Sequence, residues 1–123
     1  MDQHNTIHSR RHRRDQYMTN TAGGAVIVEA VRTAIGRGHF AKGIFRDLHP
    51  NVILGEVYRL VLQRVDLDPG RVAQVITGCV QKAGPQGTNI ARNAWLEAGL
   101  PIHIPATTLE FQCRSSQQAA HPV

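Results

Sequence analysis

The 123-residue sequence has few of the features that indicate a disulfide-rich, metal-binding or membrane-spanning protein. It contains two cysteines, Cys79 and Cys113, and no CxxC motif, so neither a disulfide framework nor a cysteine zinc site is expected. No apolar run approaches the roughly 18–20 residues that cross a bilayer, and the amino terminus lacks the apolar core of a signal peptide. We therefore expect free thiols in a reducing cytoplasm, with no metal site and no membrane partner.

Aromatic residues make up 5% of the chain, and the 9 acidic residues are outnumbered by 14 basic ones, which gives a net charge of +5. A positive charge can attract nucleic acid, although charge alone supplies only non-specific affinity. Much of the basic density lies in one block near the amino terminus, SRRHRR, and no nucleic-acid-reading motif accompanies it. We therefore predict no nucleic-acid partner.

Residues 1–24 have no apolar periodicity and are predicted to form a disordered basic tail. His4, His8 and His12 are four residues apart, a spacing that would align them on a helix and could bind a metal. No apolar face or capping residue would hold that helix, so we interpret the spacing as chance. Met18 is an alternative translation start, shortly before the first apolar run.

From residue 25 onward, apolar blocks alternate with turn residues. The run AVIVEAV (25–31) is rich in β-branched residues and predicts a buried strand. Apolar residues at helical spacing predict a helix over 51–65, which Pro69 and Gly70 follow as turn residues. A second buried strand is expected at 73–80.

The second half of the chain continues the alternation. A helix is predicted over 89–99, with Thr88 or Asn89 as its cap and Gly99 at its end. PATTLEF (105–111) predicts a third strand, and SSQQAA predicts the beginning of a last helix. This alternation of strands and helices is typical of an α/β fold with a parallel or mixed sheet.

Cys113 lies where the third strand meets this last helix. The partial positive charge of a helix N-terminus favours a thiolate, and nucleophilic cysteines are commonly built in this way. Cys79 lies within an apolar strand and is interpreted as a buried structural thiol. A nucleophile also needs a base, but His103 is in the loop before the third strand and His121 adjoins the chain end, so neither is a substitute.

Taken in order, these motifs resemble the N-terminal domain of the thiolase family. The opening strand and loop of those enzymes are similar to the segment that begins at Val26, VIVEAVRTAIGRG. The stretch that ends at the family's nucleophile is similar to the segment from Val75 to Cys113, VITGCVQKAGPQGTNIARNAWLEAGLPIHIPATTLEFQC. The resemblance implies that Cys113 carries the acyl-thioester intermediate. It also implies acyl transfer between coenzyme A thioesters, in fatty-acid or sterol side-chain metabolism, without a bound cofactor. It assigns no coenzyme A-binding residue in this chain.

The fold that the resemblance implies is a five-layered αβαβα arrangement of two similar halves, usually found as dimers or tetramers. This chain would supply the opening β-α-β-α-β of the first half and the start of the cysteine-bearing helix. The family's GHP-type histidine, asparagine motif and second cysteine have no counterpart here, so the chain is expected to be inactive alone. We interpret residues 25–123 as a truncated thiolase N-terminal domain, with a non-catalytic subunit that associates with a thiolase-like partner as the alternative.

Arg114 departs from the family pattern, which usually has a small residue, commonly glycine, after the nucleophile. A cation beside Cys113 would favour the thiolate. A side chain of this size would also occupy space that the acyl group needs.

Overall fold

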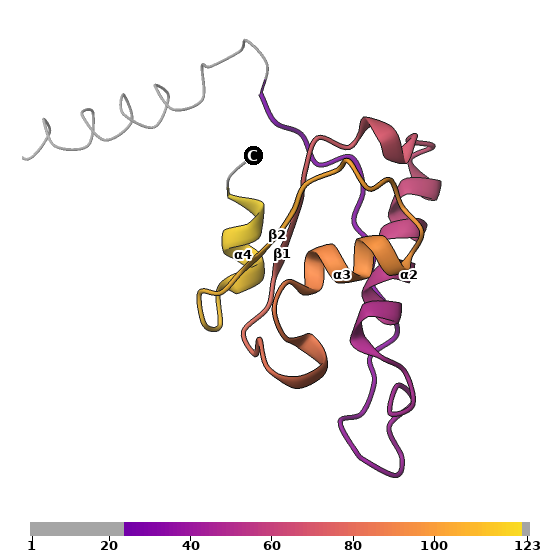
Figure 1. Ribbon diagram of the computed structural model, residues 1–123, viewed down its shortest axis with the longest axis vertical. Coiled ribbons are helices and arrows are strands. Elements are labelled where there is room, and N and C mark those ends of the chain that lie inside the picture. Colours follow the sequence, from indigo (N-terminus) through magenta and orange to yellow (C-terminus); the bar gives the residue numbers. More distant parts are fainter. Residues whose placement is uncertain (1–23, 122–123) are drawn as a thin grey trace, which may run out of the picture.

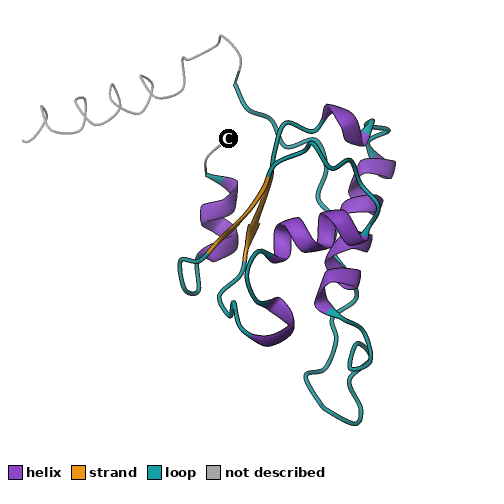
Figure 2. Cartoon of the chain, in the orientation of Figure 1, coloured by secondary structure: helices purple, strands orange, loops and turns teal. Residues whose placement is uncertain are grey.

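The structure, a computed structural model, describes residues 24–121 of the chain. The main elements are α2 (Pro50–Arg64), β1 (Val75–Gly78), α3 (Ile90–Glu97), β2 (Ala106–Leu109) and α4 (Ser115–Ala120), with short 3-10 helices η1 (Pro69–Arg71) and η2 (Gly84–Gln86) in the connections. Helices α2 and α3 lie on one side of the two strands and α4 lies on the other (Figure 1). From α2 onward, helices and strands alternate as the sequence predicts (Figure 2), and the predicted α/β class is confirmed.

The predicted tail lies almost entirely outside the described residues, and so do His4, His8, His12 and Met18. Among the described residues, no helix combines the length and apolar character needed to cross a membrane.

Strands β1 and β2 pair in parallel, from Val75 opposite Ala106 to Gly78 opposite Leu109. Parallel neighbours need a crossover connection, and α3 supplies it between these two strands. Because the strands run in the same direction, their carboxyl ends share one edge of the sheet. The pairing extends one residue beyond β1, where the Cys79 amide donates to the Leu109 carbonyl at 2.9 Å. The residues that follow β1 and β2 are therefore neighbours in space.

The helix ends follow the signals in the sequence. Pro50 is at the first position of α2, where no backbone N–H is needed, and His49 Nδ1 accepts from the Asn51 amide at 3.2 Å. Asn89 is the cap of α3, as predicted, and accepts from the Arg92 amide at 3.2 Å. Gly99 follows α3 with φ +70°, a left-handed conformation that glycine adopts without strain.

The core lies between α2, α3 and the sheet, around Trp95, which is 2% exposed. Its indole nitrogen donates to the Pro101 carbonyl at 2.8 Å, so the one polar atom of the side chain is satisfied. The buried residues packed with it are Leu62, Val75, Ala91 and Ile104. Helices α2 and α3 approach closely at Gly55, where an added Cβ would lie 3.1 Å from the Ala94 carbonyl oxygen.

The predicted strand at 25–31 does not form. The segment has no strand pairing in the described part of the chain, and Val26, Ile27 and Val28 are 79 to 92% exposed. A strand needs a neighbour for its backbone N–H and C=O groups, and here β1 pairs only with β2. Glu29 instead forms an ion pair with Arg64 of α2 at 2.9 Å.

Candidate functional site

Residues 110–115, which we call the cysteine turn, connect β2 to α4. The Phe111 carbonyl accepts from the Arg114 amide, and the Gln112 carbonyl accepts from the Ser115 amide, each at 3.1 Å. Gln112 has φ +51°, a conformation that is uncommon for residues other than glycine. These two bonds close a tight turn that brings Cys113 to the start of α4, whose N-cap residue is Arg114.

Ser115 holds the cysteine turn closed. It is 2% exposed, and it is the only buried polar residue among residues 24–121. Its Oγ accepts from the Phe111 amide at 2.8 Å and donates to the Gln112 carbonyl at 2.7 Å. One buried hydroxyl therefore ties both residues that precede Cys113 to the first residue of α4.

Gly78 allows α4 to rest on the end of β1. A Cβ added at Gly78 would lie 2.5 Å from the Ser115 carbonyl oxygen and closer still to the Ser116 amide nitrogen. These are backbone atoms, which cannot rotate away as a side-chain end can. The close approach therefore requires glycine, and it fixes the start of α4, with Cys113 before it, at the carboxyl edge of the sheet.

Both thiols are free, and both lie near this edge. Cys113 is exposed, as a nucleophile requires. Cys79 is only half-buried, so the interpretation as a buried structural thiol is wrong: it lies one residue beyond β1, a strand in which only Val75 is buried. Its Sγ is 3.6 Å from the Gln81 carbonyl and 3.7 Å from Gln86 Oε1.

Cys79 also lines an open groove of about 470 Å³ between α2, the end of β1 and residues 31–33. Most of the side chains that face the groove are apolar, among them Val31, Ile53 and Val57. Arg32 and Gln86 add polar groups to its wall. The groove brings the loop after residue 31 beside the carboxyl end of β1.

The two histidines nearest to Cys113 in the sequence are placed away from it. His103 precedes β2, whereas Cys113 follows it, so the two lie at opposite ends of that strand. The His103 ring is 3.5 Å from the Gly70 carbonyl. His121 follows the carboxyl end of α4, about 9 Å of helix away from the cysteine turn. The structure agrees with the sequence argument that neither histidine is placed as a base for Cys113.

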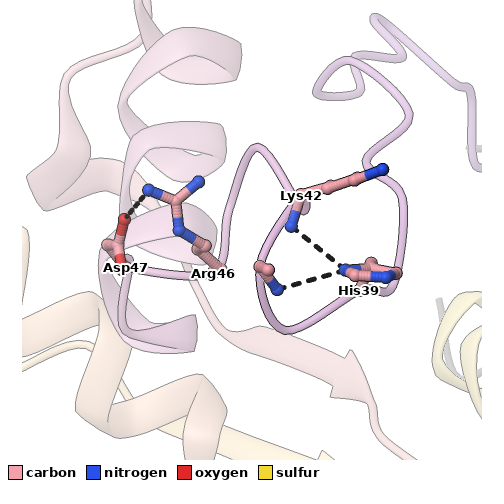
Figure 3. Close-up of polar contacts among 5 residues, drawn as sticks. His39, Lys42, Arg46 and Asp47 are labelled. Atoms are coloured by element: carbon pink, nitrogen blue, oxygen red, sulfur yellow. Dashed lines mark hydrogen bonds and ion pairs between the residues drawn. The ribbon is translucent and has the colours of Figure 1, made fainter.

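The loop before α2 has polar structure of its own (Figure 3). His39 Nδ1 accepts from the Ala41 and Lys42 amides, each at 3.1 Å, and Arg46 pairs with Asp47 at 2.9 Å. His39 is therefore engaged with the backbone of its own loop. In residues 24–121, no hydrogen bond or ion pair joins this loop to the cysteine turn, and no group of three or more metal-ligating side chains could hold an ion.

Two titratable groups outside the cysteine turn have perturbed pKa values. Burial raises the pKa of Tyr58, which packs against Trp95, and a 2.7 Å hydrogen bond with Thr77 partly offsets this effect. The pKa of Glu29 is lowered by the hydrogen bond from the Ala30 amide and then by Arg64. Both groups connect α2 to its neighbours and are not part of the cysteine turn.

These features define an α/β domain in which a strand, a tight turn and a helix present an exposed cysteine at the carboxyl edge of a parallel sheet. Residues 25–123 match the sequence profile of the family described as thiolase, N-terminal domain. The chain belongs to the thiolase family, which confirms the resemblance seen in its motifs.

Similar proteins include thiolases of several bacteria. The chain is 42% identical over 107 residues to the steroid 3-ketoacyl-CoA thiolase FadA6 of Mycobacterium tuberculosis, covering 83% of this chain and 26% of that protein. It is 43% identical over 98 residues to the 3-ketoacyl-CoA thiolase of Shewanella sp. strain ANA-3, covering 79% and 25%. The Bacillus anthracis acetyl-CoA acetyltransferase crystal structure matches with a TM-score of 0.54 and 30% identity, covering 62% and 19%. The chain therefore spans about a quarter of the length of these curated relatives.

Proposed function

We propose that this chain carries the nucleophilic cysteine of a thiolase-type acyltransferase. The observation that supports the proposal is the exposed Cys113 at a strand–turn–helix junction, held there by the buried hydroxyl of Ser115 and the close contact at Gly78. The similar proteins named 3-ketoacyl-CoA thiolase support coenzyme A thioesters as the substrates. We propose that this acyl transfer belongs to fatty-acid or sterol side-chain metabolism.

In the proposed reaction, Cys113 is the nucleophile of the first step and the leaving group of the second. Its thiolate attacks the C3 carbonyl carbon of a 3-ketoacyl-CoA, the C2–C3 bond breaks, and C2 takes a proton as acetyl-CoA leaves. The remaining acyl group stays on the Cys113 sulfur as a thioester. The thiolate of a second coenzyme A then attacks this thioester, which releases the shortened acyl-CoA and restores the cysteine. No electrons are gained or lost in either step.

Turnover also needs a base for the thiol and an acid or base for the C2 proton. Neither His103 nor His121 is placed to serve Cys113, so we propose that the 123 residues alone do not turn over. The test is thiolysis of acetoacetyl-CoA by the purified chain with added coenzyme A, compared with Cys113→Ala. Equal background rates are expected. Sustained thiolysis that disappears in Cys113→Ala would overturn the inactivity of the isolated chain.

The second proposal is a non-catalytic role in association with another copy or with a thiolase-like partner chain. It rests on apolar side chains that the described residues leave uncovered: Val26, Ile27, Val28 and Phe40 are 79 to 92% exposed. Exposed apolar surface of this kind favours association. Light scattering after size-exclusion chromatography, with and without an intact thiolase, tests the proposal. A monodisperse monomer with a cooperative melting transition in both samples would contradict it.

We further propose that residues 25–123 form the opening part of a thiolase N-terminal domain and that residues 1–24 are a tail outside it. Deletion of residues 1–17 is then expected to leave the alkylation rate of Cys113 unchanged. A cytoplasmic location fits the two free thiols, Cys79 and Cys113. Trapping of reduced thiols in fractionated cells checks the location, and oxidised thiols in a secreted fraction would argue against it.

A further inference from the structure

Arg114 directly follows the exposed Cys113 in the cysteine turn, and its own side chain is exposed as well. We propose that Arg114 is a specificity-determining residue that favours acyl groups carrying a carboxylate, such as succinyl or glutaryl groups, over alkyl chains of the same length. The inference rests on the proposed function of Cys113 as the acyl acceptor, and it names the substrate class for that site.

The charge of Arg114 is not neutralised within the described residues. The three ion pairs in residues 24–121 are Arg46–Asp47, Arg59–Glu56 and Arg64–Glu29. The carboxylate nearest to Arg114 in the sequence belongs to Glu110, and it accepts a hydrogen bond from the Gln112 side chain at 3.0 Å. Helix α4, with the sequence SSQQAA, contributes no charged side chain. A bound anion would therefore meet a guanidinium that has no ion-pair partner in residues 24–121, on the residue after the reacting cysteine.

The fold does not need arginine at this position. Arg114 is the N-cap residue of α4 but makes no side-chain capping hydrogen bond, and its φ of −103° and ψ of 11° suit most residues. Arginine is not a preferred N-cap residue, and its charge lies at the positive end of the helix dipole, where a cation is unfavourable. Residues that go against the local preferences for helix capping and helix-dipole charge, and that make no compensating contact, are typical of functional sites.

The chemistry of the guanidinium suits a carboxylate-bearing acyl group. Neighbouring Cα atoms are about 3.8 Å apart, so the flexible Arg114 side chain can reach the far end of a short acyl group held on Cys113. Its planar fork can donate two parallel hydrogen bonds to one carboxylate. An alkyl acyl group forms no hydrogen bond with the Arg114 guanidinium, and it must share space with the Arg114 side chain.

The discriminating step is transfer of the acyl group from coenzyme A to the protein. The Cys113 thiolate attacks the thioester carbon, a new carbon–sulfur bond forms, the bond to the coenzyme A sulfur breaks, and the departing thiolate takes a proton from water. Glutaryl-CoA and valeryl-CoA form a matched pair of donors, because both acyl groups have the same carbon chain and only glutaryl ends in a carboxylate. Transfer to Cys113 is followed by intact mass and peptide mapping.

We expect glutaryl transfer to exceed valeryl transfer by about two- to threefold at low salt, which is the size of an exposed, solvent-screened attraction. The preference should disappear in Arg114→Gln and persist in Arg114→Lys. Arg71→Gln is the matched control, because Arg71 is also exposed but lies in η1, before β1 and therefore at the other end of the sheet. Equal glutaryl-to-valeryl ratios in the wild-type, Arg114→Gln and Arg71→Gln chains would overturn the proposal.

A second measurement separates Arg114 from acyl transfer itself. Iodoacetate and iodoacetamide alkylate thiols by the same displacement of iodide, and only iodoacetate carries a carboxylate. The iodoacetate-to-iodoacetamide rate ratio at Cys113 is expected to fall about two- to threefold in Arg114→Gln and to stay constant in Arg71→Gln. If neither acyl donor reacts, the proposed acceptor role of Cys113 fails. In that case an unchanged alkylation ratio rejects the anion preference, whereas a reduced ratio supports the preference of Arg114 for carboxylates.

Discussion

The contact between Gly78 and the start of α4 decides where Cys113 lies, and Gly78→Ala tests it. The added Cβ would lie 2.5 Å from the Ser115 carbonyl oxygen. Non-bonded atoms normally settle near about 3.5 Å, so β1 and α4 would have to separate by about 1 Å. Overpacking of this kind costs about 1–3 kcal/mol. Since α4 has only 6 residues, the cost is concentrated on one short helix.

We expect Gly78→Ala to raise amide hydrogen exchange in residues 111–121 by about 5- to 150-fold, which corresponds to a loss of about 1–3 kcal/mol in the free energy of opening α4. Exchange is measured by mass spectrometry on the peptides of the full chain, with α3 as the internal reference. Gly38→Ala is the matched control, because a Cβ at Gly38 has no neighbour within 4 Å.

The same exchange rates in Gly78→Ala and Gly38→Ala would show that the Gly78 contact does not hold α4 in place. Such a result would mean that α4 does not rest on the end of β1. The carboxyl edge of the sheet would then not set the position of Cys113. Faster exchange throughout the chain, in α3 as much as in α4, would instead mean that the two elements unfold together.

Ser115→Ala removes both hydrogen bonds of the buried Ser115 hydroxyl, and the Phe111 amide loses the partner that closes the turn. Exchange in residues 111–121 should therefore rise by the equivalent of about 1–3 kcal/mol, whereas Ser116→Ala, at an exposed serine, should not change it. Trp95→Ala empties the core and should lower the free energy of unfolding by about 3–5 kcal/mol, seen as loss of helical circular dichroism. Burial raises the pKa of Tyr58 above 10.0, so the folded chain holds the phenol proton more tightly than the unfolded chain. The resulting contribution to the free energy of unfolding is complete below pH 10 and is lost as the pH rises through the higher pKa of the folded chain. The melting temperature should therefore fall more steeply above pH 10 in the wild type than in Tyr58→Phe, and parallel pH profiles would contradict this.

The elements that pack on their sequence neighbours were predictable from the sequence. The helical spacing in 51–65 corresponds to α2 (Pro50–Arg64), and the capping and stop signals of α3 lie at Asn89 and Gly99 as expected. The strands at 73–80 and 105–111 are shorter in the structure, because only four residues of each face a pairing partner. Local signals sufficed for these elements because the described residues contain the partners on which they pack, as β2 is present to pair with β1.

The strand predicted at 25–31 shows the limit of that reasoning. A run of β-branched residues indicates that a segment suits a covered sheet, but it does not supply the neighbouring backbone. In the described residues that neighbour is missing, and the side chains of Val26, Ile27 and Val28 stay exposed. The prediction of burial for Cys79 failed for a related reason, since only Val75 of β1 is buried and the residues from Ile76 to Cys79 are half-buried.

Part of the candidate site was also predictable. The position of Cys113 between a strand and a helix could be predicted from the chain, because both elements have clear patterns. The roles of Gly78 and Ser115 could not, since they depend on how closely α4 approaches β1 and on where the hydroxyl of Ser115 finds its partners. A glycine at the end of a predicted strand is a weak signal of such an approach.

The most direct test of the central claim is capture of an acyl group on Cys113. The purified chain is incubated with acetyl-CoA, and the site of modification is identified by peptide mapping before and after treatment with hydroxylamine, which cleaves thioesters. We expect one acetyl group on Cys113, released by hydroxylamine and absent in Cys113→Ala, with Cys79 unmodified. An unacylated Cys113 that iodoacetamide still alkylates readily, or equal acylation of Cys79 and Cys113, would contradict the account.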